Sequence, residues 1–112
     1  MHISELAALL QTARFARGTE RGLEGAVKEF LEGSGLAVER QVRSAAGRID
    51  LLTNGIALEL KVDGSLSGAL IQAQRYLSDP RVNAVLIATT CRWRLVAAMP
   101  ESLSIIRLHA LF

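Results

Sequence analysis

The sequence predicts a mixed α/β fold, in which a central mixed β-sheet containing an antiparallel three-stranded meander is flanked by helices. Three observations predict it. Residues 20–32 place apolar side chains at a helical spacing. Apolar and polar residues alternate over residues 36–62, which contain an Asn54-Gly55 turn. Residues 83–90 form the continuous apolar run of a buried strand. A chain of 112 residues is expected to form one domain, 1–112, and not two.

Two helices are expected at the N-terminal end. Apolar residues recur at a helical spacing over residues 3–15, which predicts an N-terminal helix within segment 1–17. Thr19 is a suitable N-cap for a second helix over residues 20–32, which the Gly-Ser-Gly stretch after it closes. The functional core is therefore expected within residues 19–112.

The middle of the chain is expected to form the meander. Its three strands are predicted over residues 36–43, 48–53 and 56–62. The last two are joined by Asn54-Gly55, the strongest two-residue hairpin signal.

The remainder is predicted to add one helix and further strands. Asp63 and Ser65 are candidate caps for a helix over residues 66–78, and Pro80 prevents its continuation. The further strands are expected over residues 83–90, 93–99 and 103–112.

Charge composition is informative mainly through arginine. The formal net charge is only +2, but of 13 basic residues only Lys28 and Lys61 are lysines. Arginine binds phosphate bidentately and stacks on bases, so this usage fits a nucleic-acid partner. A GC-rich genome would explain the arginine content equally well.

Other features exclude several protein classes. No run of about 18 apolar residues is present, so no membrane span is expected. The apolar N-terminus is interrupted by Glu5 and Gln11 and lacks a basic lead, so we expect no signal peptide. The single Cys91 excludes an internal disulfide and suits a cytoplasmic protein, and with only His2 and His109 it argues against structural zinc.

The predicted hairpin carries an unusual set of charges. A two-residue turn places Asp50 opposite Glu59 and, further along, Arg48 opposite Lys61. Directly opposed residues lie on the same side of a sheet with Cβ atoms about 5 Å apart, so both are repulsive pairs. Alternation predicts that Ala57, Glu59 and Lys61 face away from Leu58, Leu60 and Val62, which face the core, and that Asp50 and Leu52 face away from Ile49 and Leu51.

The opposed carboxylates become favourable if they share a divalent cation. Mg²⁺ prefers one or two protein carboxylates and keeps other positions for water and phosphate oxygens. The backbone carbonyl of Leu60 could add one oxygen ligand, and Lys61 could orient or deprotonate a water or neutralise a phosphate. The alternative is that Glu59 and Lys61 belong to an ordinary solvated face.

With these residues in place, the chain resembles the PD-(D/E)XK nuclease superfamily, which has the restriction-endonuclease-like fold. Asp50 followed by Glu59-Leu60-Lys61 resembles its signature, with Ile49 in place of the motif's proline. The order helix, three-stranded meander, helix and strand over about residues 20–90 resembles its αβββαβ core. Gln72-Ala-Gln-Arg-Tyr76 resembles the Gln-x-x-x-Tyr helix motif of the RecB-like branch.

The resemblance implies an Mg²⁺-dependent deoxyribonuclease, with Mn²⁺ as a substitute. Asp50, Glu59 and the Leu60 carbonyl would be metal ligands, and Lys61 would be catalytic. The glutamate that the family's first helix often supplies is expected to be Glu24, acting directly or through water, with Glu20 as second candidate. A Glu24–Lys28 surface ion pair is the competing interpretation for Glu24.

Contacts to substrate are expected from further residues. Gln72 and Tyr76 share one helix face and could reach the metal or a phosphate, although they could equally flank an apolar stripe. Trp93 could stack on a base but fits a core position better. The arginines expected near phosphates are Arg14, Arg17, Arg21, Arg40, Arg43, Arg48 and Arg75.

The expected partner is DNA, with structure or end specificity, as in DNA repair, recombination or phage DNA processing. Small cores of this superfamily often form homodimers, and segment 1–17 could supply the interface or simply cap the sheet. Two alternatives to an active nuclease are a nucleic-acid-binding protein on the same fold and a small α/β interaction domain. Endo- or exonuclease action, DNA or RNA preference and metal number stay open.

Overall fold

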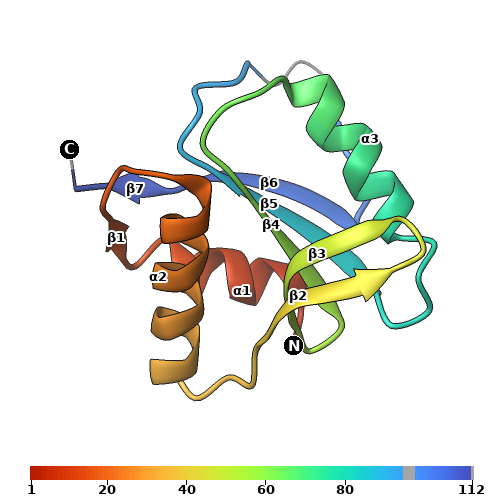
Figure 1. The fold of residues 1–112 in the computed structure, drawn as a ribbon, viewed down its shortest axis with the longest axis horizontal. Coiled ribbons are helices and arrows are strands. Elements are labelled where there is room, and N and C mark those ends of the chain that lie inside the picture. The colour runs from red at the N-terminus through yellow and green to blue at the C-terminus, as the bar shows by residue number, and fades with distance from the viewer. Residues whose placement is uncertain (95–97, 112) are drawn as a thin grey trace.

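A five-stranded mixed sheet lies between two layers of helices (Figure 1). The structure is a computed structural model that describes residues 1–94 and 98–111. Its elements in chain order are α1 (Ile3–Leu10), β1 (Arg14–Phe15), α2 (Glu20–Gly33), β2 (Glu39–Ser44), β3 (Gly47–Thr53), β4 (Ile56–Lys61), α3 (Leu66–Tyr76), β5 (Ala84–Thr89), β6 (Leu103–Arg107) and β7 (His109–Ala110).

The sheet has the strand order β2-β3-β4-β5-β6. Strands β2, β3 and β4 form the antiparallel meander, and β4, β5 and β6 run parallel. A separate two-stranded sheet pairs β1 with β7 in parallel. The predicted mixed α/β fold is therefore confirmed, and the parallel strands bring the carboxyl ends of β4, β5 and β6 to one edge of the sheet.

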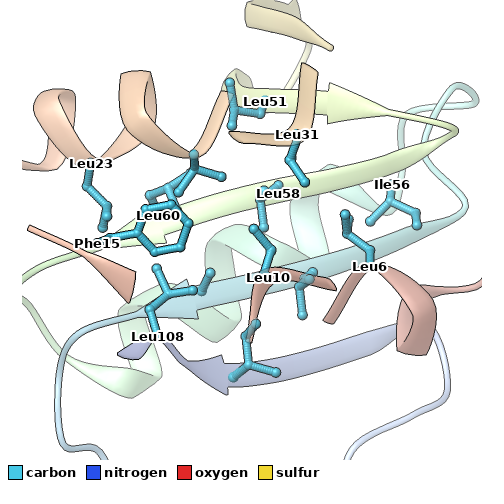
Figure 2. Close-up of a cluster of buried hydrophobic side chains, with 14 of the residues drawn as sticks. Leu6, Leu10, Phe15, Leu23, Leu31, Leu51, Ile56, Leu58, Leu60 and Leu108 are labelled. Atoms are coloured by element: carbon cyan, nitrogen blue, oxygen red, sulfur yellow. The ribbon is translucent and has the colours of Figure 1, made fainter. Parts of the chain in front are cut away.

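Each face of the sheet has its own hydrophobic core. Helices α1 and α2 cover one face, where their leucines surround Leu58 and Leu60 of β4 (Figure 2). Helix α3 covers the other face through Ala69, Ala73 and Tyr76. A fully buried leucine contributes about 1.5–3 kcal/mol relative to an exposed one, so both layers are held mainly by aliphatic burial.

Several local predictions are confirmed. Thr19 caps α2, because its side chain accepts a hydrogen bond from the Gly22 N–H at 3.0 Å. Ser65, not Asp63, caps α3 in the same way through Gly68. The apolar run is the strand β5, buried on both faces, as its lack of alternation predicts.

The prediction for segment 1–17 is wrong beyond its first turns. Helix α1 ends at Leu10, and Arg14–Phe15 is a strand that pairs with β7. The reason is tertiary: Phe15 is buried, with its ring edge-on to Phe30 at a centroid distance of 5.8 Å. The apolar face of α1 packs on the sheet, so α1 covers the sheet as one of the two expectations for this segment stated.

The C-terminal strands also differ from the prediction. Of the strand expected over residues 93–99, residues 95–97 lie outside the described residues, and the others are not in a strand. Trp93 is half-buried against the α3 face of the sheet and donates its Nε1–H to the Gly64 carbonyl at 3.1 Å. The segment expected as one strand over 103–112 is divided into β6 and β7.

Within residues 1–94 and 98–111, no helix combines the length and apolar content needed to cross a bilayer.

Candidate metal centre

The site begins where β3 and β4 separate. Their pairing runs from Thr53–Ile56 to Leu51–Leu58, the register that a two-residue turn predicts. Beyond Leu51 the strands are not paired, so the predicted Asp50–Glu59 and Arg48–Lys61 ladder pairs are absent. Instead, the backbone N–H of Leu60 donates to Oδ2 of Asp50 at 2.9 Å. A side-chain carboxylate thus takes the place of a strand carbonyl.

The β2–β3 pairing is also interrupted at this point. Arg40 pairs with Leu51 and Val42 with Ile49, but the intervening Gln41 and Asp50 are unpaired. Gln41 has a positive φ of 54°, an uncommon conformation for a residue other than glycine. The side chains of β3 also do not lie on the predicted faces of the sheet. Ile49 and Leu52 join the α3 core, whereas Leu51 joins the α1–α2 core.

Three carboxylates converge at the point of separation. One oxygen each from Glu20, Asp50 and Glu59 lie within 4.8 Å of one another. Glu20 comes from the first turn of α2, Asp50 from β3 and Glu59 from β4. The predicted proximity of Asp50 and Glu59 is therefore present, although it arises from strand separation and not from direct pairing.

Glu59 is the most deeply buried member of this acidic cluster. Its residue is 4% exposed, and its Oε2 atom is buried without a hydrogen-bond partner among the described residues. The hydroxyl of Tyr76, the chain's only tyrosine, donates its proton to the carbonyl of Arg48. A buried carboxylate oxygen without a partner is costly, so this atom is suited to a cation or a proton.

The pKa values of the cluster show how unfavourable three negative charges are here. Burial, and then the charge of Asp50, raises the pKa of Glu59 to about 9. Burial also raises the pKa of Asp50, although the hydrogen bond from Leu60 opposes that shift. Burial likewise raises the pKa of Glu20, although the charge of Lys61 opposes that shift. In the absence of a cation, the cluster therefore retains a proton at neutral pH.

Lys61 contributes a positive charge beside this cluster. Its Nζ lies 3.9 Å from Oε1 of Glu20, which is a long distance for an ion pair. Its backbone carbonyl accepts from the Thr89 hydroxyl at 2.8 Å and from the Thr90 N–H at 3.1 Å, which fixes the end of β4. The carbonyl of Leu60 points to the same side of β4 as its N–H, toward Asp50, because the two groups of a strand residue share a side.

Glu24 is not part of the cluster. It is buried, and its Oε1 accepts from Nε of Arg40 at 2.7 Å and from Nε2 of Gln41 at 2.8 Å. Lys28 pairs with Glu32 at 2.9 Å, so the Glu24–Lys28 ion pair considered from spacing is not formed. The helix glutamate that shares the acidic cluster with Asp50 and Glu59 is Glu20, the second candidate of the sequence analysis.

Gln72 and Tyr76 lie on one face of α3, as their spacing predicts, but they contact the backbone of the β2–β3 hairpin. Gln72 donates to the carbonyl of Ala46 at 3.1 Å, and Tyr76 donates to that of Arg48. Tyr76 is 2% exposed, and burial followed by the charge of Glu59 raises its pKa. Both residues therefore hold the hairpin against α3, and both also line the cavity beside Glu59.

Two cavities border the acidic cluster. Glu59 and Lys61 line one of about 350 Å³ on the α3 side. Glu20 lines another of about 310 Å³, which also contains Arg21, Glu24, Arg40, Gln41 and Arg48. Arg21 and Arg48 are thus beside the cluster, Arg17 lines a different cavity, and Arg75 is exposed on α3.

Sequence reasoning missed the roles of Arg40 and Gln41. Both donate to Oε1 of Glu24, and Gln41 does so from a strand position with a positive φ. No local pattern indicates this, since the contacts join residues 16 and 17 positions apart.

Comparisons of this chain with protein-family models, with curated proteins and with solved structures gave no match. What the acidic cluster can do is therefore judged from its own chemistry. Three carboxylate oxygens within 4.8 Å of one another, together with the buried Oε2 of Glu59 that has no partner among the described residues, fit a hard divalent cation such as Mg²⁺.

Proposed function

We propose that this protein is a metal-dependent nuclease that hydrolyses phosphodiester bonds of DNA, with a restriction-endonuclease-like core of the PD-(D/E)XK type. The single observation that carries the proposal is the convergence of Glu20, Asp50 and Glu59 beside Lys61. The order α2, β2, β3, β4, α3, β5 supports it, because it follows the αβββαβ arrangement that the resemblance implies.

Asp50, Glu59 and Glu20 would hold Mg²⁺ or Mn²⁺, with the Leu60 carbonyl as a further oxygen ligand. Such a metal polarises a phosphoryl oxygen and lowers the pKa of bound water. The contacts of Asp50 support this role, since the Leu60 N–H occupies Oδ2 and keeps the carboxylate oriented. We assign the role of helix glutamate to Glu20 in preference to Glu24, because Glu24 is already bound by Arg40 and Gln41.

Lys61 provides the positive charge on the substrate side of the cluster. Its side chain is only 27% exposed and its backbone is fixed through Thr89 and Thr90, so the ammonium group is confined near Glu20. There it can neutralise a phosphate oxygen or orient a water for in-line attack. Arg21 and Arg48, which line the adjoining cavity, are positioned to contact the flanking phosphates.

The test is a cleavage assay on linear, nicked, single-stranded and four-way-branched DNA with Mg²⁺, with Mn²⁺ and with EDTA. We expect metal-dependent cutting that Lys61→Ala reduces at least about 100-fold, as loss of a group that acts in the transition state does. Lys28→Ala, at a half-buried lysine on α2 that pairs with Glu32, is the matched control and should cut normally.

The outcomes separate the three interpretations of the fold. Binding of DNA without cutting would indicate a nucleic-acid-binding protein. Neither binding nor cutting would indicate an interaction domain and would contradict the proposal.

A further inference from the structure

A basic cavity lies beside the small β1–β7 sheet. Its volume is about 490 Å³, within the range of small-ligand sites. No carboxylate lines it among the described residues. We call it the basic cavity. The polar residues that line it are Gln11, Arg14, Arg17, Thr90, Arg107 and His109.

The strands themselves direct these side chains into the cavity. Phe15 and Leu108 are buried in the α1–α2 core, so the alternation of strand side chains turns their neighbours Arg14, Arg107 and His109 outward. Arg14 and His109 are register partners in the β1–β7 pairing and therefore share a side of that sheet. The N–H of Leu111 donates to the Phe15 carbonyl at 2.9 Å, which extends the pairing past β7.

The charge of this cavity is not balanced by the described part of the chain. No described carboxylate lies within 4.0 Å of Arg14, Arg17 or Arg107, whereas Arg40 and Arg81 each have such a partner. Three guanidinium groups around one cavity repel each other, and an anion that accepts their hydrogen bonds relieves this repulsion. Guanidinium groups match phosphate oxygens in bidentate geometry.

The basic cavity adjoins the acidic cluster along the edge of the sheet. Thr90, which lines the cavity, donates its N–H to the carbonyl of Lys61. Thr89 is the register partner of both Lys61 on β4 and Arg107 on β6. Neighbouring strands are about 4.8 Å apart, so the backbones at Lys61 and Arg107 are about 10 Å apart. One extended nucleic-acid strand can span that separation within a few nucleotides.

We propose that the basic cavity binds an internal backbone phosphate of the DNA strand whose neighbouring phosphodiester lies at the acidic cluster. The identity of the strand rests on the proposed nuclease function, but the binding of phosphate does not. The cavity would fix the position of the strand along the sheet edge, from β6 toward β4.

The test compares the variant Arg14→Gln/Arg107→Gln with the wild type. Binding of a fluorescein-labelled single-stranded DNA is followed by anisotropy in EDTA over a salt series. Loss of the one phosphate contact that the two arginines share should lower the slope of log K against log salt by about 0.7. Between about 50 and 200 mM salt, the variant should then lose about 2.6-fold less affinity than the wild type.

Arg81→Gln is the matched control. It removes one positive charge, as each single substitution does, from an exposed arginine beside Asp79, before the start of β5 and so at the opposite edge of the sheet. It should keep the wild-type slope. Because Arg14 and Arg107 are exposed, thermal unfolding should be unchanged. The single variant Arg14→Gln, with an expected slope change in the same direction of at most about 0.7, replaces the double variant if that one fails to fold.

The outcomes distinguish this inference from the proposed function. An unchanged slope in the double variant overturns the inference even if the wild type cuts DNA, and so does a wild type that does not bind single-stranded DNA. A reduced slope without cleavage by the wild type supports the inference and contradicts the nuclease. A 5′-phosphorylated and a 5′-hydroxyl strand are compared as well: an affinity gain from the terminal phosphate that the double variant loses would overturn the assignment of an internal phosphate.

Discussion

The carboxylate of Asp50 accepts a hydrogen bond from the backbone N–H of Leu60 at 2.9 Å, at the point where β3 and β4 cease to pair. This contact satisfies a strand N–H with an acidic side chain and holds Asp50 within 4.8 Å of Glu59 and Glu20. The separation of the strands is therefore what creates room for a cation between the carboxylates.

Asp50→Asn and Asp50→Ala should separate the charge of this residue from its hydrogen bond. Asparagine keeps an oxygen for the Leu60 N–H and removes one negative charge, so metal-free stability should equal or exceed that of the wild type. Alanine leaves the Leu60 N–H without its acceptor. The free energy of unfolding of Asp50→Ala should therefore be about 1–3 kcal/mol lower than that of Asp50→Asn. Urea unfolding measures both, and Mn²⁺ titration should show that both lose metal affinity. Wild-type affinity in Asp50→Asn would exclude Asp50 as a ligand.

Metal-free stability should fall as the pH rises. The pKa of Glu59 is raised to about 9 in the folded protein from an ordinary value of 4.5, so the folded state holds more protons between these values. Stability that depends on this proton is complete below about pH 4.5 and is lost progressively toward pH 9. Urea unfolding across this range measures it. Glu59→Gln, which carries no titrating group, should flatten the dependence, and an equal slope in that variant would contradict the assignment.

Metal binding should release protons at neutral pH. A cation replaces the proton that the cluster retains, so about one proton should leave per bound metal. Calorimetric titration with Mg²⁺ or Mn²⁺ in two buffers of different ionisation heat gives this number directly. At a metal concentration about 100 times Kd, the free energy of unfolding should rise by about 2.7 kcal/mol. No dependence of the heat on the buffer would show that the cluster is already ionised.

Glu20→Gln and Glu24→Gln should have opposite effects. Glu20 belongs to the acidic cluster, so its substitution should weaken metal binding and cleavage while changing stability little. Glu24 is buried and bound by Arg40 and Gln41, so its substitution should lower the free energy of unfolding by about 1–3 kcal/mol. Mn²⁺ titration and urea unfolding of both variants check this. Normal metal affinity in Glu20→Gln together with loss in Glu24→Gln would restore Glu24 as the helix ligand.

Tyr76→Phe should affect stability more than activity. The hydroxyl of Tyr76 donates to the Arg48 carbonyl, and its loss should cost about 1 kcal/mol. Cleavage per folded molecule should stay within about twofold of the wild type, because the hydroxyl is engaged with the backbone. Thermal unfolding and initial cleavage rates provide the comparison. A much larger loss of rate at unchanged stability would assign Tyr76 a direct role at the site.

The sequence by itself determined the features that depend on neighbouring residues. The Asn54-Gly55 turn set the register as far as Leu51–Leu58, Thr19 capped α2, and the run over 84–89 formed a doubly buried strand. Turn geometry, capping and hydrophobic period act over a few residues, so these could be predicted. The proximity of Asp50 and Glu59 was predicted as well, from that same register.

Only the tertiary structure decided the rest. The strand Arg14–Phe15 exists because β7, 95 positions later in the chain, pairs with it, and the choice of Glu20 over Glu24 depends on Arg40 and Gln41 reaching α2 from β2. The break in alternation at Asp50 follows from the same long-range packing. Contacts between residues far apart in the chain form only when both layers pack on the sheet, and no local pattern records them.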